Sequence, residues 1–277
     1  MAMLDFVDLL LLRRGIAHDD CSLAFRRVDG NPKSKVVYFL PLQTSFSVAR
    51  QAGFLPLDFL AAYEMPNAIA SSEPDLCLHA MLALINDAQQ LLSDNQVAAR
   101  DAVIVGLSAG SYPATYLANR IGARLCSVAS ADRVDLLIWE SPAARIVRRR
   151  ASQKGFAVSH YTHTLDGSHP AQNLRGLAPH SLFVVGRRDP LIPTGRVNGL
   201  LAAVEAQAPR CHVVKLAAGH VKTMMLSERH QRCLSGVTAR SRAWRLMDLG
   251  GWRSALAQPA VPGSAALTGI RAGGGRN

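Results

Sequence analysis

The stretch VIVGLSAGSY, residues 103–112, decides how this sequence is interpreted. It begins with β-branched residues typical of a short buried strand, and the residues from Ser111 onward favour a helix. Between them lies Gly106-x-Ser108-x-Gly110, a serine with a glycine two positions away on each side. A serine on so tight a strand-to-helix turn has strained backbone angles, and neighbours two positions away approach closely enough to exclude side chains. The pattern therefore predicts a nucleophilic serine at position 108.

Segments typical of strands and of helices alternate on both sides of this turn. This alternation predicts an α/β fold, with a mostly parallel central sheet covered by helices on both faces. The expected strands are residues 21–28, 35–40, 57–63, 102–106, 134–139, 182–186 and 211–216, and the expected helices are 45–52, 75–93, 111–121, a part of 191–208, and 221–233.

The domain organisation follows from the same pattern. We expect a single domain over residues 1–235, in which the long connection 141–179 is a candidate cap insertion. Beyond it, residues 236–277 are rich in Gly, Ala, Ser and Pro and form a basic tail that we expect to be flexible.

Composition excludes several classes of protein. Of the 277 residues, 49% are hydrophobic and 18% are charged, which excludes a disordered chain. No run of apolar residues is long enough to span a membrane. In the first fifteen residues Asp5 and Asp8 interrupt the apolar stretch and Arg13 and Arg14 follow it, the reverse of a secretory signal. We therefore expect a short amphipathic helix there and a cytoplasmic protein.

The cysteines support the same location. All five stand alone in the sequence, none forms a C-x-x-C pair, and an odd number cannot all be bridged within the chain. We interpret them as buried, reduced thiols rather than as a zinc site or a nucleophile. They are Cys21, Cys77, Cys126, Cys211 and Cys233.

A net charge of +11 raises the question of an anionic partner. The charge is concentrated in two places: the tail, where six arginines face one acid, Asp248, and the basic run 145–154. A solvated helix face and a basic tail account for this distribution, and an anionic substrate such as a coenzyme A thioester is the alternative. No nucleic-acid-binding motif accompanies the charge, so we expect no nucleic-acid partner.

Two further stretches carry a resemblance to a known family. LFVVGRRDPLIP, residues 182–193, has a buried strand followed by Asp189, and HVVKLAAGH, residues 212–220, has a last strand followed by His220. With the serine turn, their order of nucleophile, acid and histidine resembles the α/β-hydrolase fold superfamily. The resemblance covers residues 21–233, and it implies a serine hydrolase of the α/β-hydrolase fold.

The resemblance also implies roles for the residues. Ser108 would attack, His220 would take its proton, and Asp189 would hold the histidine in one tautomer. Glu140 is a rival for the acid, because it follows the expected strand 134–139. The N–H group of Ala109 would stabilise an oxyanion.

The second donor to the oxyanion comes from a place where the sequence departs from the family. Relatives often have a His-Gly pair after the strand that here is residues 35–40, but this chain continues Pro41-Leu42-Gln43. Because proline has no N–H group, the donor would be Leu42 or, as the weaker candidate, Gln43.

Other residues allow two interpretations each. His160, His163 and His169, with Asp166 among them, form an exposed polar loop or, less favourably, a metal site, and we expect no metal and no cofactor. Tyr112, Met224 and Met225 line an acyl pocket or belong to the core.

The function predicted first is carboxylesterase-like: cleavage of a small-molecule acyl ester through an acyl-enzyme. A thioesterase or acyltransferase would use the same residues, and pocket shape and water access decide between these reactions. A non-catalytic α/β-hydrolase-like binding module is the alternative from another class. The oligomeric state does not follow from the sequence.

Overall fold

Seven strands form one hydrogen-bonded sheet in the computed structural model, which describes residues 2–16 and 22–235. Their order across the sheet is β1-β3-β2-β4-β5-β6-β7. β1 runs antiparallel to β3 at one edge, and the remaining neighbours pair in parallel. The strands are β1 (Arg26–Asp29), β2 (Val36–Phe39), β3 (Ala61–Glu64), β4 (Val103–Leu107), β5 (Arg124–Val128), β6 (Leu182–Gly186) and β7 (His212–Leu216).

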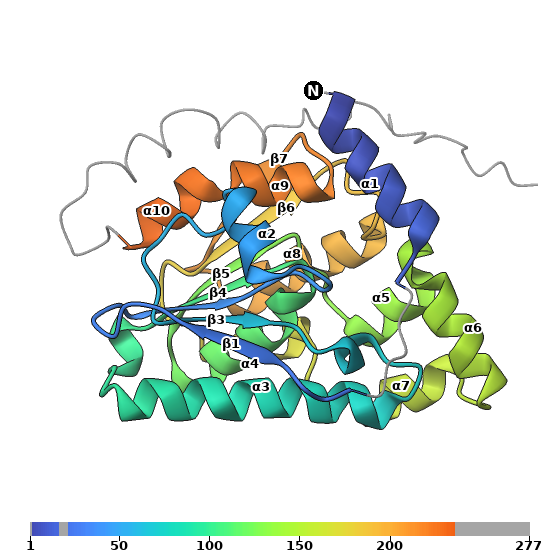
Figure 1. The fold of residues 1–277 in the computed structure, drawn as a ribbon, viewed down its shortest axis with the longest axis horizontal. Helices are drawn as coiled ribbons and strands as arrows, with labels where there is room; N and C mark the ends of the chain where they lie inside the picture. The colour runs from blue at the N-terminus through green and yellow to red at the C-terminus, as the bar shows by residue number, and fades with distance from the viewer. Residues whose placement is uncertain (1, 17–21, 236–277) are drawn as a thin grey trace, which may run out of the picture. The chain divides into compact units, whose positions relative to one another are not determined.

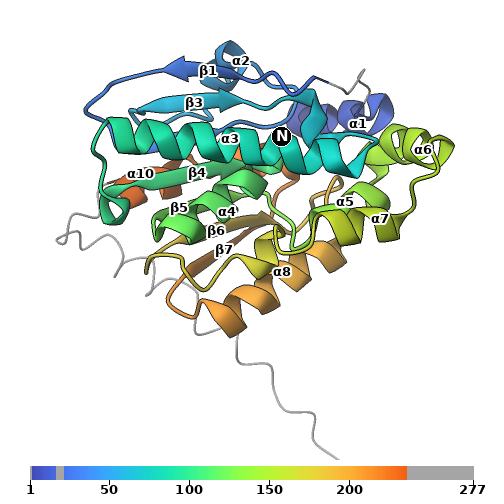
Figure 2. The ribbon, with the colours of Figure 1, turned by 90° about the horizontal axis from the view of Figure 1, so that it is seen from below.

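Helices cover both faces of this sheet (Figures 1 and 2). Helices α3, α4 and α8 lie on one face and α2, α9 and α10 on the other, while α1, α5, α6 and α7 gather at one end. The predicted α/β architecture is thus confirmed. The helices are α1 (Ala2–Arg14), α2 (Phe46–Gln51), α3 (Pro74–Asp94), α4 (Ser111–Ile121), α5 (Val134–Glu140), α6 (Arg145–Gln153), α7 (Val158–Thr164), α8 (Thr194–Gln207), α9 (His220–Leu226) and α10 (Glu228–Ser235).

Helix α3 shows how apolar spacing builds the core. Its buried residues recur every three or four positions, so one face of the helix packs inward, against α4. The helix expected over 75–93 spans one residue more at each end, and the helix expected over 111–121 coincides with α4. Both predictions are confirmed. The buried side chains of α3 include Cys77, Met81, Leu84, Ile85, Ala88 and Leu92.

One predicted strand is wrong. The apolar run 134–139 forms helix α5, in which Val134 and Ile138, four positions apart, are both buried. The strand that occupies this place in the sheet is β5, whose Arg124 and Ser127 interrupt its apolar pattern. β5 pairs with β4 on one side and β6 on the other. Hydrogen bonding to two neighbouring strands, rather than hydropathy, therefore decides which segment enters the sheet.

Other boundaries differ by smaller amounts. β1 and β3 begin several residues later than the expected strands 21–28 and 57–63. The single helix expected over 221–233 is divided into α9 and α10 at Ser227, whose hydroxyl donates to the Met224 carbonyl at 2.6 Å. The connection between β5 and β6, which includes the candidate cap 141–179, contains the helices α5, α6 and α7.

The helix expected at the N-terminus is present as α1. Within the two described ranges, no helix combines the length and apolar character needed to cross a membrane. The predicted tail, residues 236–277, lies outside the described residues.

Candidate active site

The serine of the predicted turn lies between β4 and α4. Ser108 has a φ of 53°, a left-handed angle that residues other than glycine rarely adopt. A Cβ atom on Gly106 would lie 2.6 Å from the Ala114 Cβ, and one on Gly110 would lie 2.2 Å from the Phe39 carbonyl oxygen. The strained serine and the two close approaches agree with the steric argument made from the sequence.

Hydrogen bonds connect Ser108, His220 and Asp189 in a chain. The Ser108 Oγ lies 2.7 Å from His220 Nε2, and His220 Nδ1 lies 2.7 Å from Asp189 Oδ2. The second carboxylate oxygen of Asp189 accepts the N–H groups of Leu191 and Ile192, at 2.9 and 3.0 Å. The His220 and Asp189 side chains are 5% and 2% exposed. Three residues far apart in the sequence thus meet, and both oxygens of the carboxylate have partners.

Two backbone segments border the same space. Ala109 follows the serine in the short turn η3 (Ser108–Gly110), and the first N–H groups of a helical turn have no partner within it. Leu42 follows β2 and precedes Gln43, whose φ is 60°. All of these residues line one cavity together with His220. The two N–H groups expected to stabilise an oxyanion therefore belong to residues beside the serine.

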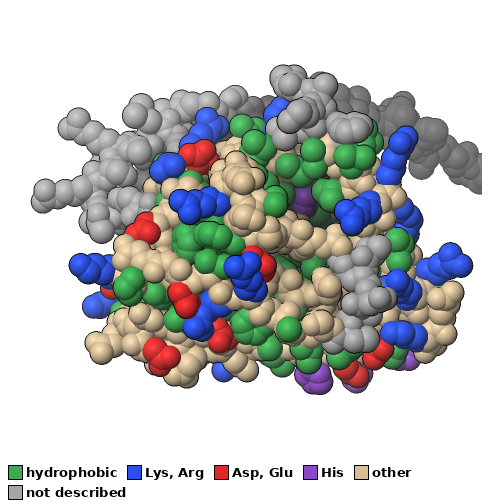
Figure 3. Space-filling model, viewed as in Figure 1, with side chains coloured by type: hydrophobic (Ala, Val, Ile, Leu, Met, Phe, Trp, Pro, Cys, Tyr) green, Lys and Arg blue, Asp and Glu red, His purple; other side chains and the backbone are tan. Residues whose placement is uncertain are grey.

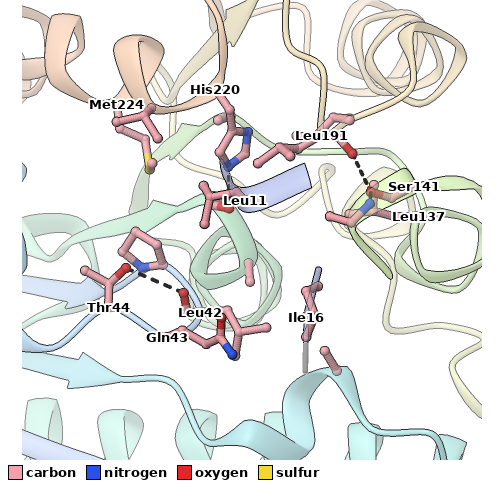
Figure 4. Close-up of a pocket in the computed structure, with 18 of the residues that line it drawn as sticks. Leu11, Ile16, Leu42, Gln43, Thr44, Leu137, Ser141, Leu191, His220 and Met224 are labelled. Atoms are coloured by element: carbon pink, nitrogen blue, oxygen red, sulfur yellow. Dashed lines mark hydrogen bonds between the residues drawn. The ribbon is translucent and has the colours of Figure 1, made fainter. Parts of the chain in front are cut away.

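The cavity has a volume of about 870 Å³ and is lined mainly by aliphatic side chains. Figure 4 shows Leu11, Leu42 and Met224 around it, with His220 on its wall. The space-filling view shows hydrophobic side chains gathered around a hollow beside α1 and α9 (Figure 3). Tyr112 and Met225, which the sequence suggested for an acyl pocket, also line the cavity, as Met224 does.

Comparison with known proteins gives the fold a name. No protein-family model matches the sequence, and the search of curated proteins found no match. Solved structures do match. A puromycin-hydrolyzing peptidase of Mycobacterium tuberculosis is 14% identical, with a TM-score of 0.51 over 73% of this chain and 34% of that one. Oligopeptidase B of Leishmania major is 13% identical, with a TM-score of 0.52 over 77% of this chain and 33% of that one.

A third structure matches over most of its own length. TT1662 from Thermus thermophilus is 15% identical, with a TM-score of 0.52 over 77% of this chain and 94% of that one. The chain has an α/β-hydrolase fold. At these identities the comparisons carry the fold and not the reaction.

Within this α/β-hydrolase fold, Glu140 does not stand where the rival acid was expected. It is the last residue of helix α5 rather than the residue after a strand, so the reason for considering it is removed. Its carboxylate forms an ion pair with Arg196, with Glu140 Oε2 at 3.2 Å from Arg196 Nε. The carboxylate hydrogen-bonded to the His220 imidazole is that of Asp189.

The sequence did not indicate the part played by α1. The family resemblance began at residue 21, yet Val7, Leu11 and Ile16 line the cavity of the α/β-hydrolase fold. Asp8 is buried and accepts the backbone N–H group of His220 at 2.8 Å. The available signal was an acid directly before four leucines, because a buried carboxylate requires a partner.

The basic run 145–154 lies mostly in helix α6, and two of its arginines bond backbone carbonyl groups. Arg145 donates to the carbonyl oxygens of Leu12 and Arg13 at the end of α1. Arg148 donates to the carbonyl oxygen of Ser141 at 2.6 Å, and burial lowers the pKa of its guanidinium. These two arginines are therefore engaged with backbone groups.

The histidine-rich segment differs from the expected exposed loop. His160 and His163 lie in α7, where the His160 Nδ1 accepts the Ala157 N–H group at 2.9 Å. His169 is 2% exposed and lies 3.3 Å from the buried Asp135, and burial lowers the pKa of its imidazole. His160, His163 and Asp166 are thus exposed as expected, but the two histidines are helical, and the interpretation as an exposed loop is wrong for the buried His169.

The described cysteines are free thiols. Cys77 and Cys126 are buried, and Cys211 and Cys233 are half-buried. Burial raises the pKa of Cys126 to about 12, which keeps its thiol protonated and unreactive. Cys21 lies outside the described residues.

Proposed function

We propose that this protein is a serine hydrolase that cleaves carboxylic esters through an acyl-enzyme. The observation that carries the proposal is the chain of two 2.7 Å hydrogen bonds from Ser108 through His220 to Asp189, at the wall of an apolar cavity. A serine hydroxyl is a weak nucleophile at neutral pH, and an adjacent imidazole activates it by accepting its proton.

In the proposed first half-reaction, the Ser108 Oγ attacks the ester carbonyl carbon while its proton moves to His220 Nε2. The N–H groups of Ala109 and Leu42 stabilise the oxyanion, and Asp189 stabilises the imidazolium. The C–O bond to the alcohol then breaks, the alcohol takes the proton from His220, and the acyl group remains on the serine.

In the second half-reaction, water attacks the acyl-enzyme and gives a proton to His220. Collapse of the second tetrahedral intermediate returns that proton to Ser108 and releases the carboxylic acid. The serine, the imidazole and the backbone donors supply all the chemistry, so the proposed reaction needs neither a metal nor an organic cofactor. The proposed partner is a small acyl ester rather than a nucleic acid, and the proposed location is the cytoplasm.

Ester cleavage is preferred to the reactions of acyl thioesters for one reason. The basic run 145–154 was the feature that favoured a coenzyme A thioester, but Arg145 and Arg148 bond backbone carbonyl oxygens. Their guanidinium groups are thereby less available to phosphates. Thioester hydrolysis and acyl transfer remain the alternatives, to be separated by the choice of substrates.

Labelling with a fluorophosphonate probe tests the proposal. The purified wild type is expected to become labelled at Ser108, identified by peptide mass spectrometry. Ser108→Ala and His220→Ala should not label, whereas Ser93→Ala, which changes an exposed serine near the end of α3, should label like wild type. A panel of p-nitrophenyl esters and acyl thioesters then ranks the substrates. A folded wild-type protein that neither labels nor turns over any of them would favour the binding-module alternative.

A further inference from the structure

Asp8 of helix α1 makes an unusual contact with the residue proposed as the base. The residue is 3% exposed, and its two carboxylate oxygens accept the N–H groups of His220 at 2.8 Å and Val221 at 3.1 Å. Helix α9 begins at His220, so these N–H groups have no partner within their own helix. A side chain 212 positions earlier in the sequence therefore fixes the backbone that carries the imidazole.

The loop before His220 is shaped around this carboxylate. A Cβ atom on Gly219 would lie 2.3 Å from Asp8 Oδ2, whereas the next nearest atom beyond the Asp8 side chain, the Arg188 carbonyl oxygen, is 3.7 Å away. Gly219 has a φ of −76°, so glycine is not required there by its backbone angle. The close approach of Asp8 is what leaves no room for a side chain.

Helix α1 is also held at its C-terminal end, beyond Asp8. The Arg145 guanidinium donates to the carbonyl oxygens of Leu12 and Arg13, and the Ile16 N–H group donates to the Ala143 carbonyl at 2.8 Å. Figure 1 shows α1 beside α9. The C-terminal end of α1 is therefore fastened by contacts separate from those of Asp8.

The negative charge of Asp8 acts on His220 in addition to its hydrogen bonds. Among the described residues, the charges of His220 from α9 and of Asp189 from the loop after β6 act on it. Burial raises the pKa of Asp8, while the Val221 N–H group and the charge of His220 lower it. A carboxylate beside the imidazole favours the imidazolium that the proposed reaction creates.

We propose that Asp8 is a positioning residue for His220: it holds the backbone of the base from helix α1 and adds a second negative charge beside the imidazole. This inference rests on the proposed function. It makes α1 part of the apparatus that performs the reaction, although the serine, acid and histidine motifs all lie outside it.

The test compares Asp8→Asn and Asp8→Ala with Arg145→Gln, which removes contacts at the C-terminal end of α1 and leaves the bonds between Asp8 and His220 in place. Asp8→Ala is expected to lower kcat for a p-nitrophenyl ester on the order of 10- to 100-fold, because small displacements of a reacting group cost about that much. KM should change less than about two-fold. Asp8→Asn, which keeps one acceptor oxygen, should lose less, and Arg145→Gln should keep kcat near wild type.

The pH profile separates positioning from a general loss of structure. Without the Asp8 charge the imidazole is harder to protonate, so the acidic limb of kcat/KM should move to lower pH in both Asp8 variants. A merely structural defect would lower the amount of active enzyme without moving the limb. Gly219→Ala disturbs the same contact, because its Cβ would displace the Asp8 carboxylate, and it should lower kcat similarly. Combining Asp8→Ala with Gly219→Ala should cause no further loss of kcat.

The possible results separate the inference from the proposed function. A wild type that turns over esters while the Asp8 variants keep both its kcat and its acidic limb overturns the inference and leaves the proposed function intact. Equal losses of kcat in Arg145→Gln and Asp8→Ala, with no shift of the acidic limb of kcat/KM, also overturn the inference. If Asp8→Ala does not fold, the same comparison is made with Asp8→Asn and Gly219→Ala. A wild type without labelling or turnover would instead remove the proposed function itself.

Discussion

At Ser108, local strain is retained because the surrounding backbone leaves no relaxed alternative. A φ of 53° costs a non-glycine residue of the order of 1–3 kcal/mol, and such strain persists where neighbouring packing determines it. Gly110 lies against the Phe39 carbonyl at the end of β2, and Gly106 lies against the first turn of α4. The turn is therefore tight because strand β2 and helix α4 close on it from both sides.

Gly110→Ala is expected to destabilise the protein. Its Cβ would lie 2.2 Å from a backbone oxygen, so strand β2 or the turn must move, at a cost of roughly 1–3 kcal/mol in the free energy of unfolding. Urea unfolding measures this, and probe labelling should fall because Ser108 shifts with the turn. Gly195→Ala, in helix α8 with no atom within 4 Å of its Cβ, is the matched control and should be neutral or slightly stabilising. Equal stability of Gly110→Ala and wild type would contradict the steric account.

At the scale of elements, the place of β5 decides which of the two candidate acids lies beside His220. The neighbour of β4 and β6 is β5, so the apolar run that follows is free to form α5. Glu140 then ends a helix and pairs with Arg196, while Asp189 follows β6 at the edge where β7 leads into His220. Because residues 134–139 form a helix and not the expected strand, Glu140 loses the position expected of the acid. Asp189 keeps its position after a strand.

Asp189→Asn should therefore lower kcat strongly, on the order of 10³- to 10⁴-fold, because an amide holds the histidine in the wrong tautomer. Glu140→Gln, 43% exposed and paired with Arg196, should change kcat by less than about two-fold. Steady-state kinetics on one ester compares the two variants, with thermal unfolding to check that both are folded. A larger loss in Glu140→Gln than in Asp189→Asn would return the role of the acid to Glu140.

At the scale of the whole molecule, buried titratable groups make stability depend on pH in two opposing ways. His169 and His230 are 2% and 5% exposed, and burial lowers the pKa of each imidazole. The unfolded chain binds protons on these residues near pH 6.5, whereas the folded protein does not, so acid favours unfolding. Burial raises the pKa of Asp8 and Asp132, so their contribution is lost as the pH rises from about 4 through their folded pKa.

The free energy of unfolding should therefore fall as the pH drops below about 6.5, by up to about 1.4 kcal/mol per pH unit for each fully titrating histidine. His169→Gln should reduce that slope between pH 5 and 6.5, and His163→Gln, which changes an exposed residue of α7, should keep the wild-type slope. Urea unfolding at several pH values gives the slopes. The carboxyl groups are the same in all three proteins, so their opposing effect cancels in the comparison. Equal slopes in wild type and His169→Gln would show that His169 does not contribute to the pH dependence of the free energy of unfolding.

Features that depend on neighbours in the chain could be predicted from the amino-acid sequence alone. The spacing of glycines around Ser108, the helical period of α3 and α4, and the strands β4 and β6 all follow from local sterics and burial. The order of Ser108, Asp189 and His220 along the chain could also be predicted, because each residue lies in a short motif of its own.

The remaining features required the folded structure, because they depend on partners far apart in the sequence. β5 is a strand because two neighbours bond its backbone, although it carries Arg124 and Ser127. Asp8 is buried because the N–H groups of His220 and Val221, more than two hundred positions away, satisfy its carboxylate. No local pattern encodes a hydrogen bond whose donor and acceptor meet only when the chain has folded.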